Sequence, residues 1–203
     1  PTQPNSTPYY TTNIKYQIGT TLDATYNTGS GALNDSSPLV QAVGDVAATP
    51  KALTGCVTAK GGQNSYAAEV LTKAQAALPV VAGTQNVIIF LSDGDYNASA
   101  TQLSNQTSKV TKQCDQAIAA AQAATTAGTT VYAVAYGAPS SGCSSGDTHN
   151  PCTTMQAIAS DKSRFYTTDS SCQMTGSPNA VASLPSAFQA ITTNLTKPRL
   201  VVK

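Results

Sequence analysis

Two aspartates in a short acidic loop are the residues best placed to do chemistry. Asp93, Gly94 and Asp95 directly follow Val87–Ser92, an apolar run typical of a buried strand. Ligands of open α/β sheets bind at the carboxyl ends of strands, which favours a functional role for this loop. Asp-Gly is also a common turn sequence, so the carboxylates could instead only stabilise a turn. Spacing alone leaves both interpretations open.

One chemistry for this loop is hydrolysis of the haloacid dehalogenase type, in which an Asp, any residue, Asp loop holds a nucleophile and Mg²⁺. Such an enzyme also needs a downstream Lys and a second acidic cluster. The sequence offers only isolated later acids, at Asp115, Asp147, Asp161 and Asp169. The single histidine, His149, lies in a polar loop, and no Gly-x-Ser-x-Gly stretch joins a predicted strand directly to a predicted helix, as a nucleophile elbow would. We therefore predict that the protein is not an enzyme.

The elements around the loop are predicted from hydrophobic periodicity. Apolar residues at helical spacing indicate three amphipathic helices. The first presents Ala67, Val70, Leu71, Ala74 and Leu78; the second Val110, Cys114, Ala117, Ile118, Ala121 and Ala124; the last Leu184, Phe188, Ile191 and Leu195. Residues 130–136 form another apolar strand, so residues 87–136 make a βαβ unit with a parallel sheet. A short helix at 153–160 and a brief strand at 164–167 follow.

Bulk composition excludes several classes of protein. The 203 residues carry a net charge of +1 and only 10% are charged, so no basic surface for nucleic acid is expected. No apolar run is long enough for a membrane span. We predict an irregular region of loops and short strands at 1–62, with strands at 14–18 and 39–43. It belongs to the same domain as residues 63–203.

Five cysteines among polar loops favour disulfides in an oxidising compartment, and hence a secreted or cell-surface protein. Cys143 and Cys152 bracket one short loop and are the easiest pair. The sequence leaves open the partners of Cys56, Cys114 and Cys172, one of which is free or bonded to a segment outside this chain.

Several stretches in combination resemble a known family. The sequence NVIIFLSDGDYNAS at residues 86–99 is similar to the fourth strand and metal loop of von Willebrand factor type A (vWA) domains. The likeness is greatest to those of bacterial Tad-pilus-associated exported proteins. Residues 61–79, 113–137, 152–168 and 188–200 also match in order. The resemblance implies a vWA-like, Rossmann-like α/β fold, with a mostly parallel sheet flanked by helices.

The resemblance also implies a metal-dependent adhesion site at the top of the sheet. Asp93 takes the position of the third-loop Asp and Ser65 that of the second-loop hydroxyl. Hard oxygen ligands of this kind suit Mg²⁺, Mn²⁺ or Ca²⁺, with an open position for a partner's carboxylate. On this reading Asp95 contributes to loop geometry only.

The chain departs from the family pattern at its first motif. No Asp-x-Ser-x-Ser loop follows an apolar strand, and the family's first, central strand is missing. The metal site is therefore incomplete, and a cation is absent if nothing else completes it. Loss of that strand would leave backbone groups beside residues 87–91 unpaired. We expect a protein partner, an upstream fragment retained through Cys56, or another copy to supply a strand.

The leading interpretation is a protein-binding or adhesion module, metal-assisted or simply surface-mediated, in pilus-like attachment. The alternative is a structural subunit of an extracellular assembly with a vestigial metal site. A Mg²⁺-dependent hydrolase has the least support.

Overall fold

The computed structural model describes residues 27–30, 32–34, 37, 65–100, 103, 109–175 and 180–196. The chain divides into two compact units, Pro1–Gln63 and Asn64–Lys203, and each is described by itself. The strands predicted at 14–18 and 39–43 lie outside the described residues. The assignment of residues 1–62 to the same domain as the rest stays a prediction.

The described part of the first unit is a short antiparallel pairing. Strands β1 (Asn27–Thr28) and β2 (Ala32–Leu33) pair with Thr28 opposite Ala32. The Thr28 hydroxyl donates to the Ala32 carbonyl oxygen at 3.1 Å, which closes the turn between the two strands.

The second unit contains a parallel three-stranded sheet. Strands β3 (Val87–Ser92), β4 (Thr130–Ala135) and β5 (Phe165–Thr167) lie in the order β3-β4-β5. Their composition is rich in β-branched and aromatic residues, and β4 is an almost continuous buried run, as expected for a strand with both faces covered. The predicted α/β class with a parallel sheet flanked by helices is confirmed, while its vWA-like identity stays a prediction.

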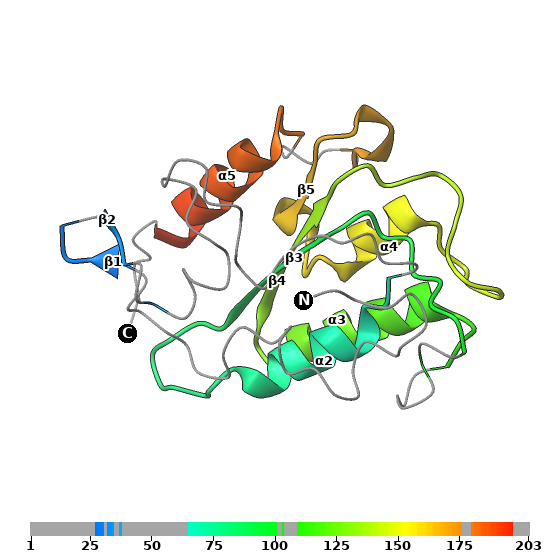
Figure 1. The fold of residues 1–203 in the computed structure, drawn as a ribbon, viewed down its shortest axis with the longest axis horizontal. Helices are drawn as coiled ribbons and strands as arrows, with labels where there is room; N and C mark the ends of the chain where they lie inside the picture. The colour runs from blue at the N-terminus through cyan, green and yellow to red at the C-terminus, as the bar shows by residue number, and fades with distance from the viewer. Residues whose placement is uncertain are drawn as a thin grey trace. The chain divides into compact units, whose positions relative to one another are not determined.

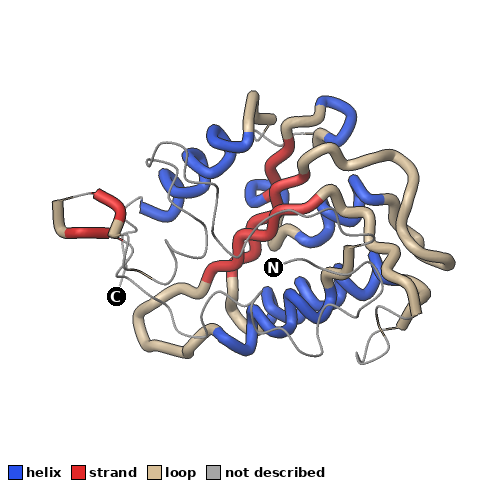
Figure 2. The backbone as a smooth tube through the Cα atoms, in the orientation of Figure 1, coloured by secondary structure: helices blue, strands red, loops and turns tan. Residues whose placement is uncertain are grey.

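Four α-helices accompany the sheet in this unit's described residues (Figure 1). They are α2 (Ala68–Ala77), α3 (Gln113–Thr126), α4 (Pro151–Ile158) and α5 (Leu184–Thr196). Two 3₁₀ turns, Lys162–Arg164 and Ser170–Cys172, flank β5. Helices α2, α3 and α4 lie on one side of the strands and α5 lies on the other, as the tube view also makes clear (Figure 2). None of the helices in the described residues is long and apolar enough to cross a membrane.

The side of the sheet beneath α2, α3 and α4, which we call the packed face, carries the larger core. Its strand residues are Ile88, Val131, Ala133, Ala135 and Phe165. They pack with Leu71 of α2, with the alanine-rich side of α3, and with Met155 and Ile158 of α4. Small side chains on α3 allow that helix to approach the strands closely, which suits a densely packed layer.

The opposite side, which we call the open face, carries a smaller cluster. Tyr132, Val134 and Tyr166 pack there against Ala187 and Ile191 of α5. Side chains alternate along a strand, so Ile89 and Leu91 of β3 share this face. They remain 38% and 45% exposed, because the cluster under α5 is built on β4 and β5.

Parts of the predicted helix faces are wrong. Val70 is 46% exposed although it belongs to the predicted apolar face of α2. Val110 precedes the first residue of α3 and is 43% exposed. On α5 the buried residues are Ala187 and Ile191, whereas Phe188 and Leu195 are 37% and 40% exposed. Apolar spacing alone cannot show how much of a helix the rest of the fold covers.

Candidate functional site

The acidic loop is built around Gly94, at the carboxyl end of β3. Gly94 is buried and has a φ of +82°, a left-handed conformation that strongly favours glycine. A Cβ at this position would overlap the carbonyl oxygen of Pro151 and lie 2.8 Å from Cγ of Met155. The first turns of α4 therefore pack directly against the acidic loop and restrict its backbone conformation.

Asp93 is exposed at the start of the loop. Its Oδ1 accepts a hydrogen bond from the backbone N–H of Asp95 at 3.1 Å and a longer one from the Ser92 hydroxyl at 3.5 Å. The Ser92 hydroxyl oxygen in turn accepts from the N–H of Gly94 at 3.1 Å. These contacts define an Asx-type turn that presents the Asp93 carboxylate to solvent.

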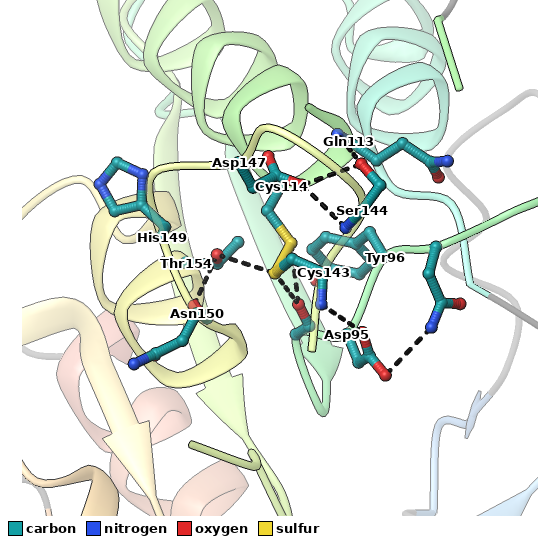
Figure 3. The surroundings of a disulfide bond; sticks show 12 residues. Asp95, Tyr96, Gln113, Cys114, Cys143, Ser144, Asp147, His149, Asn150 and Thr154 are labelled. Atoms are coloured by element: carbon teal, nitrogen blue, oxygen red, sulfur yellow. Dashed lines mark hydrogen bonds between the residues drawn. A yellow bond between two sulfur atoms is a disulfide. The ribbon is translucent and has the colours of Figure 1, made fainter. Parts of the chain in front are cut away.

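Asp95 holds the acidic loop to a second loop. Its Oδ1 accepts from the backbone N–H of Cys143 at 2.7 Å, and its Oδ2 accepts from the Asn97 side chain at 3.2 Å (Figure 3). Both carboxylate oxygens are thus used within the protein. This agrees with the prediction that Asp95 contributes loop geometry.

Ser65 lies beside the far end of the acidic loop. Its backbone forms an isolated parallel bridge with Tyr96, and its side chain is exposed. Tyr96 itself is buried, which raises the pKa of its phenol well above the usual range. The fold therefore brings the two predicted metal ligands, Asp93 and Ser65, to neighbouring segments.

The donor set at Asp93 and Ser65 does not by itself make a metal site. One carboxylate and one hydroxyl are two of the roughly six oxygen ligands that Mg²⁺ or Ca²⁺ takes. Among the described residues, the cluster of at least three acidic, histidine or cysteine ligands lies elsewhere, at Cys114, Cys143 and Asp147. Asp93 and Ser65 alone therefore do not complete the coordination of a cation.

Two disulfides close the loops behind the acidic loop. Cys114 bonds to Cys143 and Cys152 bonds to Cys172, with Cα–Cα separations of 5.9 and 5.5 Å. The predicted pair of Cys143 with Cys152 is wrong, and Cys56 lies outside the described residues. The physical reason is that Cys152 belongs to α4, whereas Ser144 accepts a hydrogen bond from the first residue of α3 and so brings its neighbour Cys143 beside Cys114. Two disulfides are compatible with an oxidising compartment.

The start of α3 is capped by the loop that carries Cys143. Asp147 Oδ1 accepts from the N–H of Asp115 at 2.8 Å. Its Oδ2 accepts from both the N–H and the hydroxyl of Ser144 at 2.9 Å (Figure 3). The hydroxyl oxygen of Ser144 accepts from the N–H of Gln113 at 2.8 Å. These bonds satisfy backbone donors that a helix start otherwise leaves open.

Asp115 and Asp147 are not isolated acids, contrary to the sequence interpretation. His149 Nδ1 lies 2.8 Å from Asp115 Oδ1, and the Thr148 hydroxyl donates to the same oxygen at 3.0 Å. Partial burial acts to raise the pKa of Asp115, but the hydrogen bonds from His149 and Thr148 outweigh it and hold the pKa below its ordinary value. His149 therefore belongs to a hydrogen-bonded contact between its own loop and Asp115 at the start of α3.

Asp161 and Asp169 have structural roles of their own. Each accepts a hydrogen bond from the N–H two residues later, at Ser163 and Ser171, and so caps a 3₁₀ turn. The backbone and hydroxyl bonds from Ser171 lower the pKa of Asp169. None of the four later acids lies in a described acidic cluster with Asp93 or Asp95.

Sequence reasoning missed the residues that join these loops. Asn150 caps α4 through a capping box with Thr153, a pattern that the Asn-Pro dipeptide at 150 and 151 could have indicated. Gln113 is 2% exposed, and its amide bonds to both backbone groups of Ala98, which fixes the segment after the acidic loop. No local sequence signal indicates that second role.

No protein-family model, curated protein or solved structure matches the chain. The resemblance to vWA domains therefore stays a prediction from the motifs themselves.

Proposed function

We propose that the chain is an extracellular protein-binding module that accepts an extended segment of a partner protein along the outer edge of β3. The observation that carries this proposal is the position of β3 at the end of the described sheet, with β4 on one side only. Addition of a strand to a sheet edge is a common way for proteins to bind peptides.

The hydrogen-bond pattern defines which backbone groups a partner would meet. The carbonyl oxygens of Asn86 and Ser92 accept from the N–H groups of Thr130 and Tyr136, at 2.9 and 3.1 Å. Alternate residues of a parallel strand bond to the same neighbour, so the even-numbered residues of β3 bond to β4. The N–H and C=O groups of Ile89 and Leu91 therefore point to the outer edge, where the described residues place no paired strand.

The side chains along this edge support binding of an apolar segment. Val87–Ser92 contains no charged residue and no proline, whereas free sheet edges usually carry such residues to prevent pairing. Ile89 and Leu91 add exposed apolar surface on the open face. A partner strand would pair with the backbone and bury these side chains together.

The two disulfides and the neutral, polar composition support a secreted or cell-surface location. The resemblance to vWA domains of Tad-pilus-associated proteins adds a role in pilus-like attachment. A cation, Mg²⁺ in the first instance, would bind at Asp93 and Ser65 only when a partner or water supplies the missing ligands. Binding along β3 does not depend on it.

A second candidate function is a structural subunit of an extracellular assembly, in which another copy of the chain supplies the strand. The same edge supports it, because strand exchange between identical chains would pair the outward groups of Ile89 and Leu91. The two functions differ in whether a different protein or another copy of this chain supplies the added strand.

The test is a photo-crosslinking amino acid in place of Leu91 in the full chain, produced and exported by its source cell. We expect a crosslink to a different protein, found by mass spectrometry of the crosslinked peptides. The variant Ile89→Pro removes one outward N–H and leaves the β4 ladder intact, so it should abolish the crosslink. Val81→Pro, in an exposed loop, is the matched control and should retain it.

Each outcome of this experiment discriminates between the hypotheses. A crosslink to another copy would favour the structural subunit. A crosslink within the same chain, or none at all, would contradict both. The enzyme hypothesis has a separate test: it would be supported by Mg²⁺-dependent hydrolysis of an aryl phosphate that disappears in Asp93→Asn, and we expect no hydrolysis.

A further inference from the structure

We propose that reduction of the Cys114–Cys143 disulfide converts this part of the molecule into a Zn²⁺ site, with the two thiolates and the Asp147 carboxylate as ligands. In the described residues these three side chains form one cluster, and their ligand atoms all lie within 4.8 Å of one another. In the oxidised chain the two sulfur atoms are bonded to each other, so the cluster binds no metal in that state.

The spacing suits a tetrahedral zinc ion. Zinc binds thiolates at about 2.3 Å and carboxylate oxygens at about 2.0–2.2 Å, which places neighbouring ligand atoms roughly 3.5–3.8 Å apart. Once the disulfide is broken, rotation of the cysteine side chains would be enough to move the two sulfurs to this separation. Two thiolates and a carboxylate favour zinc over the hard cations that would suit Asp93.

Asp147 is already oriented as a ligand. Hydrogen bonds from Asp115 and Ser144 fix its carboxylate, and Oδ1 accepts only one of them, which leaves a lone pair for a metal ion. Contacts of this kind hold the ligands of known zinc sites in place. Cys143 is likewise held by the bond from its N–H to Asp95.

Further oxygen atoms surround the two sulfurs. The carbonyl oxygen of Gly94 lies 3.4 Å from Cys114 Sγ and 3.7 Å from Cys143 Sγ, and the Thr154 hydroxyl lies 3.8 Å from Cys143 Sγ (Figure 3). A fourth zinc ligand is therefore available from Gly94 or from water. The Gly94 contacts also join the site to the acidic loop, so metal binding would preserve the loop contact that the disulfide makes in the oxidised chain.

The chemistry proceeds in two balanced steps. A dithiol reductant transfers two electrons: its thiolate attacks Cys143 Sγ, Cys114 leaves as a thiolate, and the reductant's second thiol releases Cys143 as it closes to a disulfide. Zn²⁺ then binds the two cysteine sulfurs, and each thiol that was protonated releases its proton on binding. The attack is written at Cys143 because this residue is partly exposed, whereas Cys114, Cys152 and Cys172 are buried.

The second disulfide provides a control within the same molecule. Cys152 and Cys172 also become thiols on full reduction, but no third acidic, histidine or cysteine ligand accompanies them in the described residues. The proposal therefore predicts zinc binding at one of two reduced cysteine pairs.

The test uses the full chain with Cys56→Ser, fully reduced with a phosphine, given Zn²⁺, and exposed to a thiol-alkylating reagent. Peptide mapping should show Cys114 and Cys143 protected at least tenfold by zinc, and Cys152 and Cys172 alkylated at the same rate with and without it. Metal analysis after desalting should give one zinc per reduced chain and none per oxidised chain. Equal protection of all four cysteines, or of none, would overturn the proposal.

Variants separate ligation from folding. Asp147→Asn should weaken zinc binding at least about tenfold in a chelator competition. Thr148→Ala removes a hydroxyl bond to Asp115 from the same loop but touches neither Asp147 nor a cysteine, so it should bind zinc within about twofold of the parent chain. A second readout is the thiolate charge-transfer absorption of bound Co²⁺, which should be present in the Cys152→Ser, Cys172→Ser chain. It should be absent in the Cys114→Ser, Cys143→Ser chain, and the reverse pattern would refute the site.

Discussion

The two faces of the sheet are built from the same strands but differ in how they are covered. On the packed face, Ile88 of β3 is 8% exposed beneath a layer of three helices. On the open face its neighbour Ile89 is 38% exposed, because the cluster under α5 centres on β4 and β5. Strand β3 therefore combines a structural side with a side available for binding. The acidic loop lies on the structural side, because α4 packs against Gly94.

The largest expected effect comes from a matched pair of substitutions on β3. Ile88→Ala should lower the free energy of unfolding by about 2–5 kcal/mol, since it leaves a cavity in the packed face. Ile89→Ala should cost about 1 kcal/mol or less, since its side chain is already partly in solvent. Urea denaturation of the two variants measures both values. Equal losses would contradict the difference in burial between the two faces.

The next prediction concerns the contact between the packed face and the acidic loop. Gly83 and Gly94 both have positive φ, at +77° and +82°, but a Cβ at Gly83 meets no atom within 4 Å. Gly83→Ala should therefore cost only the conformational strain of about 1–2 kcal/mol. Gly94→Ala should cost more than that in thermal or urea unfolding, because the added carbon overlaps Pro151. A Gly94→Ala chain as stable as Gly83→Ala would mean that α4 does not press on the loop.

A smaller effect is expected at the start of α4. Asn150→Ala removes the side-chain acceptor of the capping box and should lower the free energy of unfolding by about 1 kcal/mol. Asn150→Ser, which can still cap, should recover most of the loss. If both variants were equally unstable, the side chain would act through another contact.

The smallest effect is a pH dependence at Asp115. Its folded-state pKa lies below the ordinary value of about 3.9, so its contribution to stability is present above that pH and is lost as the pH falls through the folded-state pKa. Asp115→Asn should therefore be less stable than the parent chain at pH 7, and the difference should shrink below about pH 4. Urea denaturation across this pH range measures the difference in unfolding free energy between the two chains. A difference that does not change with pH would contradict the lowered pKa of Asp115.

Local sequence predicted the elements that depend on local periodicity. The apolar run of β3, the alanine-rich buried side of α3 and the parallel pairing of β3 with β4 are all confirmed. Helix faces near an incompletely covered surface were predicted less well. Phe188 and Leu195 are exposed on α5, since a spacing pattern does not report which neighbours a helix will meet.

The candidate site likewise combines residues that local sequence predicts with contacts that it does not predict. Asp93, Gly94 and Asp95 were found because they end a strong strand, and the sequence alone indicates an acidic turn there. The tertiary structure decided the rest: it paired Cys114 with Cys143, tied Asp95 to Cys143, and brought Asp147 to both sulfurs. The disulfide joins residues 29 apart and the bond between Asp95 and Cys143 joins residues 48 apart, and no local pattern encodes contacts over such separations. The physical reason is that propensity and periodicity act over a few residues, whereas a site forms only where packing brings distant loops together.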